Sequence, residues 1–514
     1  MSRSDDIGVI MTMTDTAFTR PGPLERREWG AFIDGQFVPV DDRETFEVVE
    51  PSTARPLARV VSADAAVVNR AVHSARLALP AWRELSGRQR GMYLKQVAER
   101  IRAHADELGE LVSRENGKPK RDALANDVAF SSNCFDFFAG LGDSLPGEII
   151  DQGPIETRVL YEPYGVVACI LPFNWPPIHF AKKGAPALIT GNTVVIKPGE
   201  QAPLTVLRLV EIANEVLPPG VLNAVPGLEA GAALAGHPRV ERISFTGATA
   251  TGRRVLETAA QNLTYATMEL GGKNALIVFP DAEMDLAVEV SIEGMFYNQG
   301  EACTSTARIL VHDNVYDEFL ARFTAAATAL VVGDGLDPRT DVGPMVDARQ
   351  RDRVLGYLQT ALDEGARLVG QGTAPTDPAY AEGFWVPPTV LADVTPDSTV
   401  GQEEIFGPIA LIMRYSTLDE AIEIANGTRY GLTAAMITRD EAQAWHVAQR
   451  LEAGMVFVNN YMRRSFLGSP FGGIKGSGFG RENAPETLHE FVRSKAVRFR
   501  SGRGEIPVWP PRRG

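Results

Sequence analysis

The sequence predicts an α/β fold made of two α/β domains and a small β-strand arm. Short runs rich in β-branched residues, each bounded by Gly, Pro or Asn, alternate with amphipathic helical patterns along most of the chain. These runs are apolar throughout, which is typical of parallel strands that helices cover on both faces. The 514 residues allow two to four domains at about 100–200 residues each.

The alternation is clearest in the middle of the chain. We expect strands at 193–197, 242–245 and 274–279 and helices at 204–216 and 252–260. A further amphipathic helix is predicted to begin at the N-cap Asp281 and to stop near Gly300, just before Cys303. A second region rich in strands and helices follows, from about 305 to 480.

Two segments interrupt this alternation. Residues 153–171 resemble two strands joined at 162–165, which predicts a hairpin. Residues 484–514 contain the alternating strand 495–500, which has no partner nearby in the sequence. An unpaired strand favours edge pairing, so we expect an arm that joins subunits; the alternative is an ordinary edge strand of the same chain. Residues 1–27 are expected to form a loose tail.

Composition excludes several classes of function. The 51 basic and 65 acidic side chains give a formal net charge of −14, which argues against a nucleic-acid partner. No run reaches the roughly 18 apolar residues of a membrane-spanning helix, so we expect no membrane partner. The three cysteines have neither a disulfide-framework nor a zinc spacing, so we expect a reducing cytoplasm and no metal.

The three cysteines lie in different surroundings. Cys169 lies inside an apolar strand and is expected to pack in the core. Cys134 lies in the aromatic helical stretch 130–138, where it either packs or lines a pocket. Cys303 lies in a polar turn after an amphipathic helix, where a thiolate can be exposed and stabilised. Cys303 is therefore the candidate nucleophile, with a buried packing role as the alternative.

Two further side chains suit acyl chemistry. Asn174 lies between prolines that fix its backbone, and a rigidly held amide is what an oxyanion hole needs. The alternative for Asn174 is a helix cap. Glu269 lies between apolar residues and two glycines, where partial desolvation would raise its pKa toward that of a general base. The alternative for Glu269 is an ordinary solvated carboxylate.

Three places suit a dinucleotide. Residues 244–252 form a strand, a Gly-x4-Gly turn and a helix start, which presents backbone N–H groups to a phosphate. Lys197 and Glu200 follow a strand and suit the hydroxyls of a ribose, and this carboxylate favours NAD over NADP. Glu404 and Phe406 suit the nicotinamide end. The alternative at each place is an ordinary turn or a surface acid.

Taken together, these motifs resemble the NAD(P)-dependent aldehyde dehydrogenase superfamily from about residue 28 to residue 500. Seven motifs occur in the order typical of that family. They are Pro-Phe-Asn-Trp-Pro (172–176), Lys-Pro-Gly-Glu (197–200), Phe-Thr-Gly (245–247), Glu-Leu-Gly-Gly-Lys (269–273), the Cys303 segment, Glu-Glu-Ile-Phe-Gly-Pro (403–408) and Pro-Phe-Gly-Gly (470–473).

The resemblance implies a role for each matching residue. Cys303 matches the nucleophile, Glu269 the general base and Asn174 the oxyanion donor together with the Cys303 N–H. Lys183 and Glu482 match a proton-relay pair. The implied cofactor contacts are Leu171, Pro172, Phe173, Asn174, Lys197, Glu200, Gly227, Phe245, Thr246, Gly247, Ala248, Glu269, Leu270, Glu404 and Phe406. The implied substrate contacts are Phe130, Cys134, Trp175, Ile178, Lys182 and the loop 461–469 with Arg463 and Arg464.

The resemblance also implies an architecture. It consists of an NAD-binding domain (28–152 and 173–271), a catalytic domain (272–482) and an oligomerisation arm (153–172 and 483–514), assembled as a homodimer or homotetramer. The implied reaction is NAD-dependent oxidation of an aldehyde to its acid through a cysteine thiohemiacetal and a thioester. The aromatic residues favour an apolar or aromatic aldehyde, whereas Arg463 and Arg464 would instead clamp the carboxylate of a semialdehyde.

Three departures and two rival functions complete the prediction. Ala248 replaces a common Ser, Glu301 replaces a common Gln and would raise the pKa of Cys303, and the loop 225–231 looks short. The rivals are a CoA-acylating enzyme and a non-catalytic member of the family. Retention of Glu269 argues against the first, and retention of both Cys303 and Glu269 argues against the second.

Overall fold

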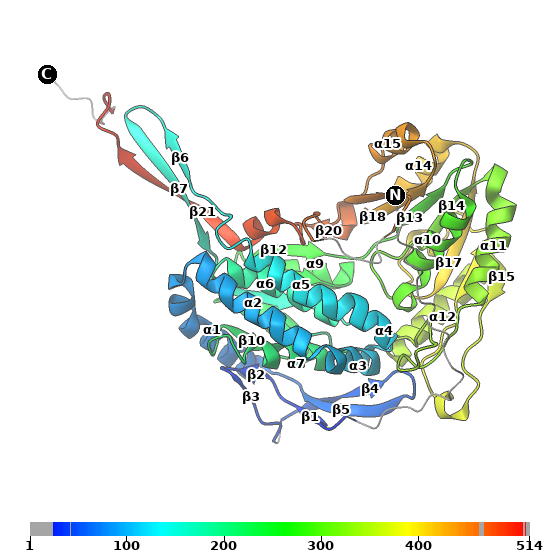
Figure 1. Cartoon of the computed structure of the whole chain (residues 1–514), viewed down its shortest axis with the longest axis horizontal. Helices are drawn as coiled ribbons and strands as arrows, with labels where there is room; N and C mark the ends of the chain where they lie inside the picture. The colour runs from blue at the N-terminus through cyan, green and yellow to red at the C-terminus, as the bar shows by residue number, and fades with distance from the viewer. Residues whose placement is uncertain (1–23, 42, 462–466, 507–508, 510–514) are drawn as a thin grey trace, which may run out of the picture.

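The computed structural model describes residues 24–41, 43–461, 467–506 and 509. Within them, two large sheets form the centres of two α/β units, and a narrow arm projects away from the first unit (Figure 1). The predicted α/β class with two such units is confirmed. None of the helices in these ranges combines the length and the apolar character that crossing a membrane requires.

The first large sheet has eight strands, of which the five in the middle run parallel. In spatial order the strands are β20 (Gly478–Phe479), β12 (Tyr265–Glu269), β11 (Arg242–Thr246), β8 (Val166–Ile170), β9 (Thr193–Lys197), β10 (Leu222–Ala224), β2 (Phe32–Ile33) and β3 (Gln36–Phe37). Every residue of β8, β9 and β11 is buried, as expected for strands covered on both faces.

Alternate residues of these strands belong to two different cores. Val167 and Val194 pack with one set of helices, whereas Val166 and Val195 pack with another. The helices of the first unit are α1 (Ala65–Glu84), α2 (Gly87–Ala103), α3 (Ala105–Asn116), α4 (Lys120–Asp122), the π-helix η1 (Ala123–Val128), α5 (Ala129–Ala139), α6 (Pro176–Ile189), α7 (Leu204–Ala213), α8 (Leu228–Ala235) and α9 (Thr249–Ala260). A third sheet, β1 (Glu28–Trp29), β5 (Arg55–Val61) and β4 (Thr45–Glu50), lies beside this unit (Figure 1).

The second large sheet has seven strands, all parallel except the edge strand β15. In order they are β15 (Arg367–Gln371), β16 (Thr389–Ala392), β17 (Ile409–Tyr415), β14 (Arg308–His312), β13 (Ala275–Val278), β18 (Thr433–Ile437) and β19 (Met455–Val458). Its helices are α10 (Met284–Phe296), η2 (Tyr297–Gly300), η3 (Asp313–Val315), α11 (Tyr316–Thr328), α12 (Ala348–Asp363), η4 (Pro378–Tyr380), α13 (Thr399–Gln402), α14 (Leu418–Asn426) and α15 (Glu441–Ala448).

The N-cap of helix α10 lies two residues later than predicted. The carboxylate of Glu283 caps it by accepting from the backbone N–H groups of Asp285 (3.1 Å) and Leu286 (2.8 Å). Asp281, the predicted N-cap, instead accepts hydrogen bonds from Thr438 Oγ1 (2.8 Å) and the Arg439 N–H (3.0 Å). The N-cap prediction was therefore wrong, because Asp281 bonds a distant loop that sequence order does not reveal.

The predicted hairpin over 153–171 is also wrong. Strand β7 (Ile155–Pro163) pairs antiparallel with β6 (Glu148–Asp151), whereas β8 runs parallel to β9 and β11 inside the first large sheet. The physical reason is burial, because all five residues of β8 need cover on both faces while all four residues of β6 are exposed. The hairpin is thus β6–β7.

The C-terminal strand finds its partner within the chain. β21 (Val492–Arg500) pairs antiparallel with β7 along its whole length, from Val492 opposite Pro163 to Arg500 opposite Ile155. The resulting three-stranded arm extends away from the two units at the upper left of Figure 1. The short helices η5 (Lys475–Ser477) and η6 (Pro485–Phe491) precede the strand. Its role in joining subunits, like the domain boundaries, stays a prediction.

Candidate active site

Cys303 follows a sharp reversal of the chain after α10. Asn298, Gln299 and Gly300 all have positive φ, of 53°, 47° and 70°. Two consecutive non-glycine residues in this region cost free energy, so the surrounding structure must hold them there, as often occurs at functional sites. At Gly300 a Cβ would lie 2.5 Å from the Gly407 carbonyl, so only glycine fits. The reversal turns Cys303 back toward the first unit.

The turn 271–274 contacts the Cys303 loop and holds it in place. Asn274 Nδ2 donates to the carbonyls of Cys303 (2.8 Å) and Ser305 (2.9 Å). A Cβ on Gly272 would lie 2.6 Å from the Cys303 carbonyl oxygen, so the missing side chain is what admits the loop. Arg308 braces the same turn by donating to the Lys273 carbonyl from Nε (3.0 Å) and Nη2 (2.7 Å).

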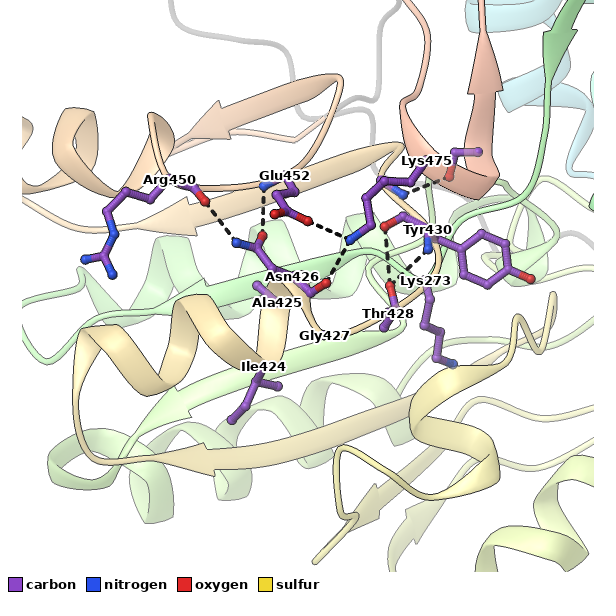
Figure 2. Close-up of polar contacts among 12 residues, drawn as sticks. Lys273, Ile424, Ala425, Asn426, Gly427, Thr428, Tyr430, Arg450, Glu452 and Lys475 are labelled. Atoms are coloured by element: carbon purple, nitrogen blue, oxygen red, sulfur yellow. Dashed lines mark hydrogen bonds and ion pairs between the residues drawn. The ribbon is translucent and has the colours of Figure 1, made fainter.

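Behind this turn lies a polar cluster on the second unit. Figure 2 shows the Lys475 ammonium between the Asn426 carbonyl (2.8 Å) and the Glu452 carboxylate (2.9 Å). The Lys273 side chain extends away from that cluster in Figure 2, and burial followed by the charge of Arg308 lowers its pKa to about 7. The Lys475 ammonium thus joins two segments behind the turn, and the Lys273 ammonium takes no part in these contacts.

Glu269 ends β12 in a desolvated position. Only 2% of the residue is exposed, and neither carboxylate oxygen has a hydrogen-bond partner among the described residues. Burial, reinforced by the charge of Glu482, raises the pKa of Glu269 well above its ordinary value. This environment agrees with the desolvation expected from the sequence, and it leaves both oxygens available to accept a proton.

The Cys303 thiol is protonated at neutral pH in this structure. Burial raises its pKa to about 12; the Glu404 carboxylate adds to that effect, the Lys182 ammonium opposes it, and the Glu269 carboxylate again adds to it. The expectation that Glu301 raises this pKa was wrong, because the carboxylates that act on the thiol are Glu404 and Glu269. The Glu301 carboxylate points elsewhere and accepts from the Val346 N–H (3.2 Å) and Gln299 Nε2 (3.0 Å).

Asn174 lies in the loop between β8 and α6, and only 3% of the residue is exposed. Its Nδ2 donates to the Glu301 carbonyl (3.0 Å), which joins the loop to the Cys303 segment. Its own carbonyl accepts from Lys118 Nζ (3.3 Å) and Asn298 Nδ2 (3.3 Å). One N–H of the Asn174 amide therefore stays free to donate to a ligand.

Lys183 and Glu482, the predicted relay pair, form a buried ion pair. Lys183 Nζ lies 2.6 Å from Glu482 Oε1 and donates to Ser244 Oγ (3.1 Å). Lys182 Nζ lies 3.1 Å from the other carboxylate oxygen of Glu482. Although burial opposes it, the charges of Lys183 and then Lys182 hold the pKa of Glu482 at about 2.

The predicted cofactor residues gather at one edge of the first large sheet, where its parallel strands end. The carboxyl ends of such strands are where open α/β sheets bind ligands. Here Leu171 and Pro172 follow β8, Lys197 ends β9 and Glu200 follows it, and Gly227 follows β10. Phe245 and Thr246 end β11 and are followed by Gly247 and Ala248, and Glu269 ends β12 and is followed by Leu270. Lys197 and Glu200 form an ion pair.

The turn after β11 leaves groups that a ligand would satisfy. Thr246 Oγ1 is buried without a hydrogen-bond partner among the described residues. Ala248 occupies the N-cap of α9 and provides no side-chain cap, so the first N–H groups of this helix lack that partner. From the second unit, Glu404 accepts from the Gly272 N–H (3.0 Å), and Phe406 meets Phe173 edge to face at 5.9 Å.

The predicted substrate residues differ in exposure. Trp175 is partly exposed and stacks on Tyr297 with ring centroids 5.6 Å apart, and Ile178 is also partly exposed. Cys134 has no exposed surface and belongs to the hydrophobic core, which is the environment of a packing residue, and Phe130 is 7% exposed. Arg463 and Arg464 lie outside the described residues.

Lys118 is a site residue that sequence reasoning missed. It is fully buried, pairs with Asp127 (2.6 Å) and places its ammonium 3.8 Å from the centroid of the Trp175 ring. It also donates to the Asn174 carbonyl, so it fixes both residues of the loop after β8. The signal in the sequence was the polar segment Glu-Asn-Gly-Lys (115–118), in which a glycine follows two polar residues that turn out to be buried.

Comparisons with known proteins agree with this geometry. The model of the aldehyde dehydrogenase family matches residues 37–497. The chain is 46% identical to aldehyde dehydrogenase citD of Monascus ruber, over 91% of this chain and 94% of that protein. A putative aldehyde dehydrogenase of Burkholderia cenocepacia superposes with a TM-score of 0.92 at 41% identity, over 95% of this chain and 100% of that one. An aldehyde dehydrogenase of Bacillus cereus in complex with NAD⁺ gives 0.89 at 34%, over 92% and 97%.

Proposed function

The chain belongs to the aldehyde dehydrogenase family, and we propose that it oxidises an aldehyde to the free carboxylic acid with NAD, through covalent intermediates on Cys303. One observation carries the proposal. Cys303 and Asn174 come from two loops and Glu269 from the end of β12, and the hydrogen bond from Asn174 to the Glu301 carbonyl links the two loops directly. A nucleophile, an amide donor and an unpartnered carboxylate are the three groups that acyl chemistry on a thiol needs.

In the first step the Cys303 thiol loses its S–H proton to water, and the thiolate adds to the aldehyde carbon. Negative charge then develops on the aldehyde oxygen. The free N–H of the Asn174 amide and the backbone N–H of Cys303 donate to this oxygen. Because Asn174 is already held by Glu301, Lys118 and Asn298, its donor needs no reorganisation during the step.

The residues present fit a dinucleotide. The buried Thr246 Oγ1 without a partner and the uncapped start of α9 suit the pyrophosphate, and the Lys197–Glu200 pair suits the adenosine ribose. Glu404, which accepts from the Gly272 N–H, suits the nicotinamide end. When bound, NAD supplies the hydride acceptor that no side chain provides. Oxidation of the thiohemiacetal leaves a thioester on Cys303.

Glu269 completes the reaction by accepting a proton from water as that water attacks the thioester. Its oxygens have no hydrogen-bond partner to displace among the described residues, and burial raises its pKa above the ordinary value, which makes the carboxylate a stronger base. Lys183 and Glu482 provide a buried polar route for that proton. The presence of Glu269 favours water over CoA as the acyl acceptor.

The test follows NADH formation with a panel of aldehydes, with and without CoA. Wild type is expected to form NADH without CoA, Cys303→Ala is expected to form none, and Cys169→Ala serves as the control for loss of a buried thiol. The proposal fails if wild type is inactive with every aldehyde or if Cys303→Ala remains fully active. Strict dependence on CoA would assign the acyl-transfer activity instead.

For the substrate class, we propose an aromatic or apolar aldehyde. The Trp175–Tyr297 stack, backed by the Lys118 ammonium, offers a flat apolar surface beside Asn174. Trp175→Ala should then raise the KM for an aromatic aldehyde more than that for a short aliphatic one. A semialdehyde clamped by Arg463 and Arg464 is the alternative, and a higher kcat/KM for an aldehyde bearing a distal carboxylate would favour it.

We further propose a preference for NAD, because the Glu200 carboxylate at the ribose end would repel a 2′-phosphate. Glu200→Gln should lower the ratio of kcat/KM with NAD to kcat/KM with NADP. An unchanged ratio would remove this role.

We also propose that the arm joins protomers into a dimer or tetramer. It exposes Ile149 (70%), Leu160 (46%) and Phe499 (45%), which is unusual for isolated large apolar side chains on one small sheet. Sedimentation of the wild type and of Ile149→Lys tests the assembly. The three free thiols fit a reducing compartment such as the cytoplasm.

A further inference from the structure

Four buried ionisable side chains lie together behind the candidate active site. Lys182 and Lys183 are neighbours on α6, Glu482 lies between their ammonium groups at 3.1 Å and 2.6 Å, and Glu269 faces them from the end of β12. None of the four is more than 4% exposed. We call these residues the lysine–carboxylate cluster.

The cluster contains one more positive than negative charge when Glu269 is protonated. Both lysines pair with Glu482, whose pKa of about 2 keeps it ionised. Glu269 has no hydrogen-bond donor among the described residues, and its pKa is raised well above the ordinary value. Two ammonium groups then share a single carboxylate. Two buried ammonium groups that share one carboxylate leave a net positive charge, which favours a nearby anion.

Lys182 is the member whose charge acts to lower the pKa of both Cys303 and Glu269, and the charge of Lys183 also acts on Glu269. Its Nζ lies 3.4 Å from the centroid of the Phe471 ring. The next residue, Gly472, packs so closely on Glu269 that a Cβ there would lie 2.9 Å from Glu269 Oε1. Lys183 instead turns toward Ser244 in β11. Lys182 is also the ammonium that opposes the raised pKa of Cys303.

The other titratable groups around Lys182 do not supply this charge. On α6, burial and then the two lysines keep the pKa of His179 well below its ordinary value, so His179 is neutral. On α5, burial raises the pKa of the Cys134 thiol and keeps it protonated. Lys118 has its own partner in Asp127, and Glu404 repels a thiolate. Arg481 precedes Glu482 and acts on Glu269 after both lysines.

We propose that Lys182 provides the surplus positive charge that stabilises the anion of the reacting centre, first the Cys303 thiolate and later the ionised Glu269. Lys182 touches neither reacting atom, so it is an electrostatic positioning residue. When the thiolate forms, the S–H proton leaves to water and no other bond changes. The inference rests on the proposed function for the role of Cys303, but the charge effect itself is measurable without turnover.

The experiment measures the rate of Cys303 alkylation by iodoacetamide from pH 5 to 10, without aldehyde and both with and without NAD. Mass spectrometry separates Cys303 from the buried Cys134 and Cys169. The pKa of Cys303, about 12, lies above this range, so the alkylation rate follows the small thiolate fraction at each pH. Lys182→Met is expected to raise that pKa by about one unit or more, which slows alkylation about tenfold or more at each pH. Lys182→Arg should keep the alkylation rate near that of wild type because it keeps the charge.

A second substitution should change the alkylation rate in the opposite direction. Glu482→Gln removes the carboxylate that both lysines share, so it should speed alkylation of Cys303 at a fixed pH. A merely structural role would make Lys182→Met and Glu482→Gln change the rate in the same direction, since both break the same ion pair. Lys120→Met, which removes a lysine paired with Asp106 (2.8 Å) far along the chain, is the matched control.

The proposal is overturned if Lys182→Met leaves the alkylation rate at a fixed pH unchanged or increases it, or if Glu482→Gln decreases it. Thermal unfolding checks that each variant is folded, and the Lys182→Arg and Glu482→Gln pair still decides the matter if Lys182→Met does not fold. If no aldehyde yields NADH, the proposed function fails, whereas the alkylation profiles still report whether Lys182 acts on Cys303.

Discussion

The side-chain amide of Asn174 donates to the backbone carbonyl of Glu301 across 3.0 Å, although 127 positions separate the two residues. Glu301 precedes Cys303 by two residues, so this bond ties the amide to the loop that carries the thiol. The bond uses one N–H of the amide and orients the other. The two halves of the candidate site are therefore positioned relative to each other before any substrate binds.

Asn174→Ala should lower kcat about 100- to 1,000-fold, because it removes a preorganised donor to the developing oxyanion. Steady-state NADH formation measures the loss. Asn214→Ala is the matched control, since Asn214 also donates to two carbonyls, at 2.8 Å and 3.2 Å, but lies away from the site. An equal loss of kcat in both variants would contradict a role specific to Asn174.

Glu269→Gln should trap the thioester. The amide cannot accept a proton from water, whereas Cys303 and Asn174 are unchanged, so oxidation should still give about one NADH per active site before turnover stops. Rapid mixing measures the burst, and intact mass detects the acylated enzyme. Glu452→Gln, in the polar cluster of Figure 2, is the control. Full steady-state turnover by Glu269→Gln would remove Glu269 from the base role.

Gly272→Ala should reduce activity with little change in overall fold. The added Cβ would lie 2.6 Å from the Cys303 carbonyl oxygen and 2.7 Å from Asn274 Oδ1, so the Cys303 loop must shift. Activity and circular dichroism together test this. In α12, Gly356→Ala meets no atom within 4 Å and should stabilise the helix by about 0.5–1 kcal/mol without loss of activity. Unchanged kcat in Gly272→Ala would show that the loop position is not critical.

Glu301→Gln should change how stability depends on pH. Burial raises the pKa of Glu301 from 4.5 to about 8. Between those values the native state binds more protons than the unfolded state, so this group makes the free energy of unfolding fall as pH rises, and above about pH 8 it adds no further change.

Glutamine does not titrate, so Glu301→Gln should remove that decline, which has a limiting slope of about 1.4 kcal/mol per pH unit. Urea unfolding at pH 5, 6.5 and 8 measures the effect. The variant should gain stability relative to wild type as pH increases. A constant difference between the two proteins across this range would contradict the pKa assigned to Glu301.

Much of the fold could be predicted because the residue types of a buried strand indicate directly that it is buried. The strand predicted at 193–197 is β9, with the same ends, because a run of buried β-branched residues between Gly-Asn and Pro-Gly has few alternatives. The hairpin predicted over 153–171 was wrong because two adjacent extended segments look alike in sequence. One of them, β8, lies inside the first large sheet, whereas the other, β7, lies in the arm.

The sequence by itself determined the family, the order of the motifs and the three candidates Cys303, Glu269 and Asn174, because each depends on residue type and near neighbours. The tertiary structure decided which charges act on them. Glu404 and Glu269, not Glu301, raise the pKa of Cys303; Lys118 fixes the loop after β8; and Lys182 joins Lys183 at Glu482. Electrostatic effects depend on distance and burial between segments far apart in the chain, and those quantities exist only once the chain has folded.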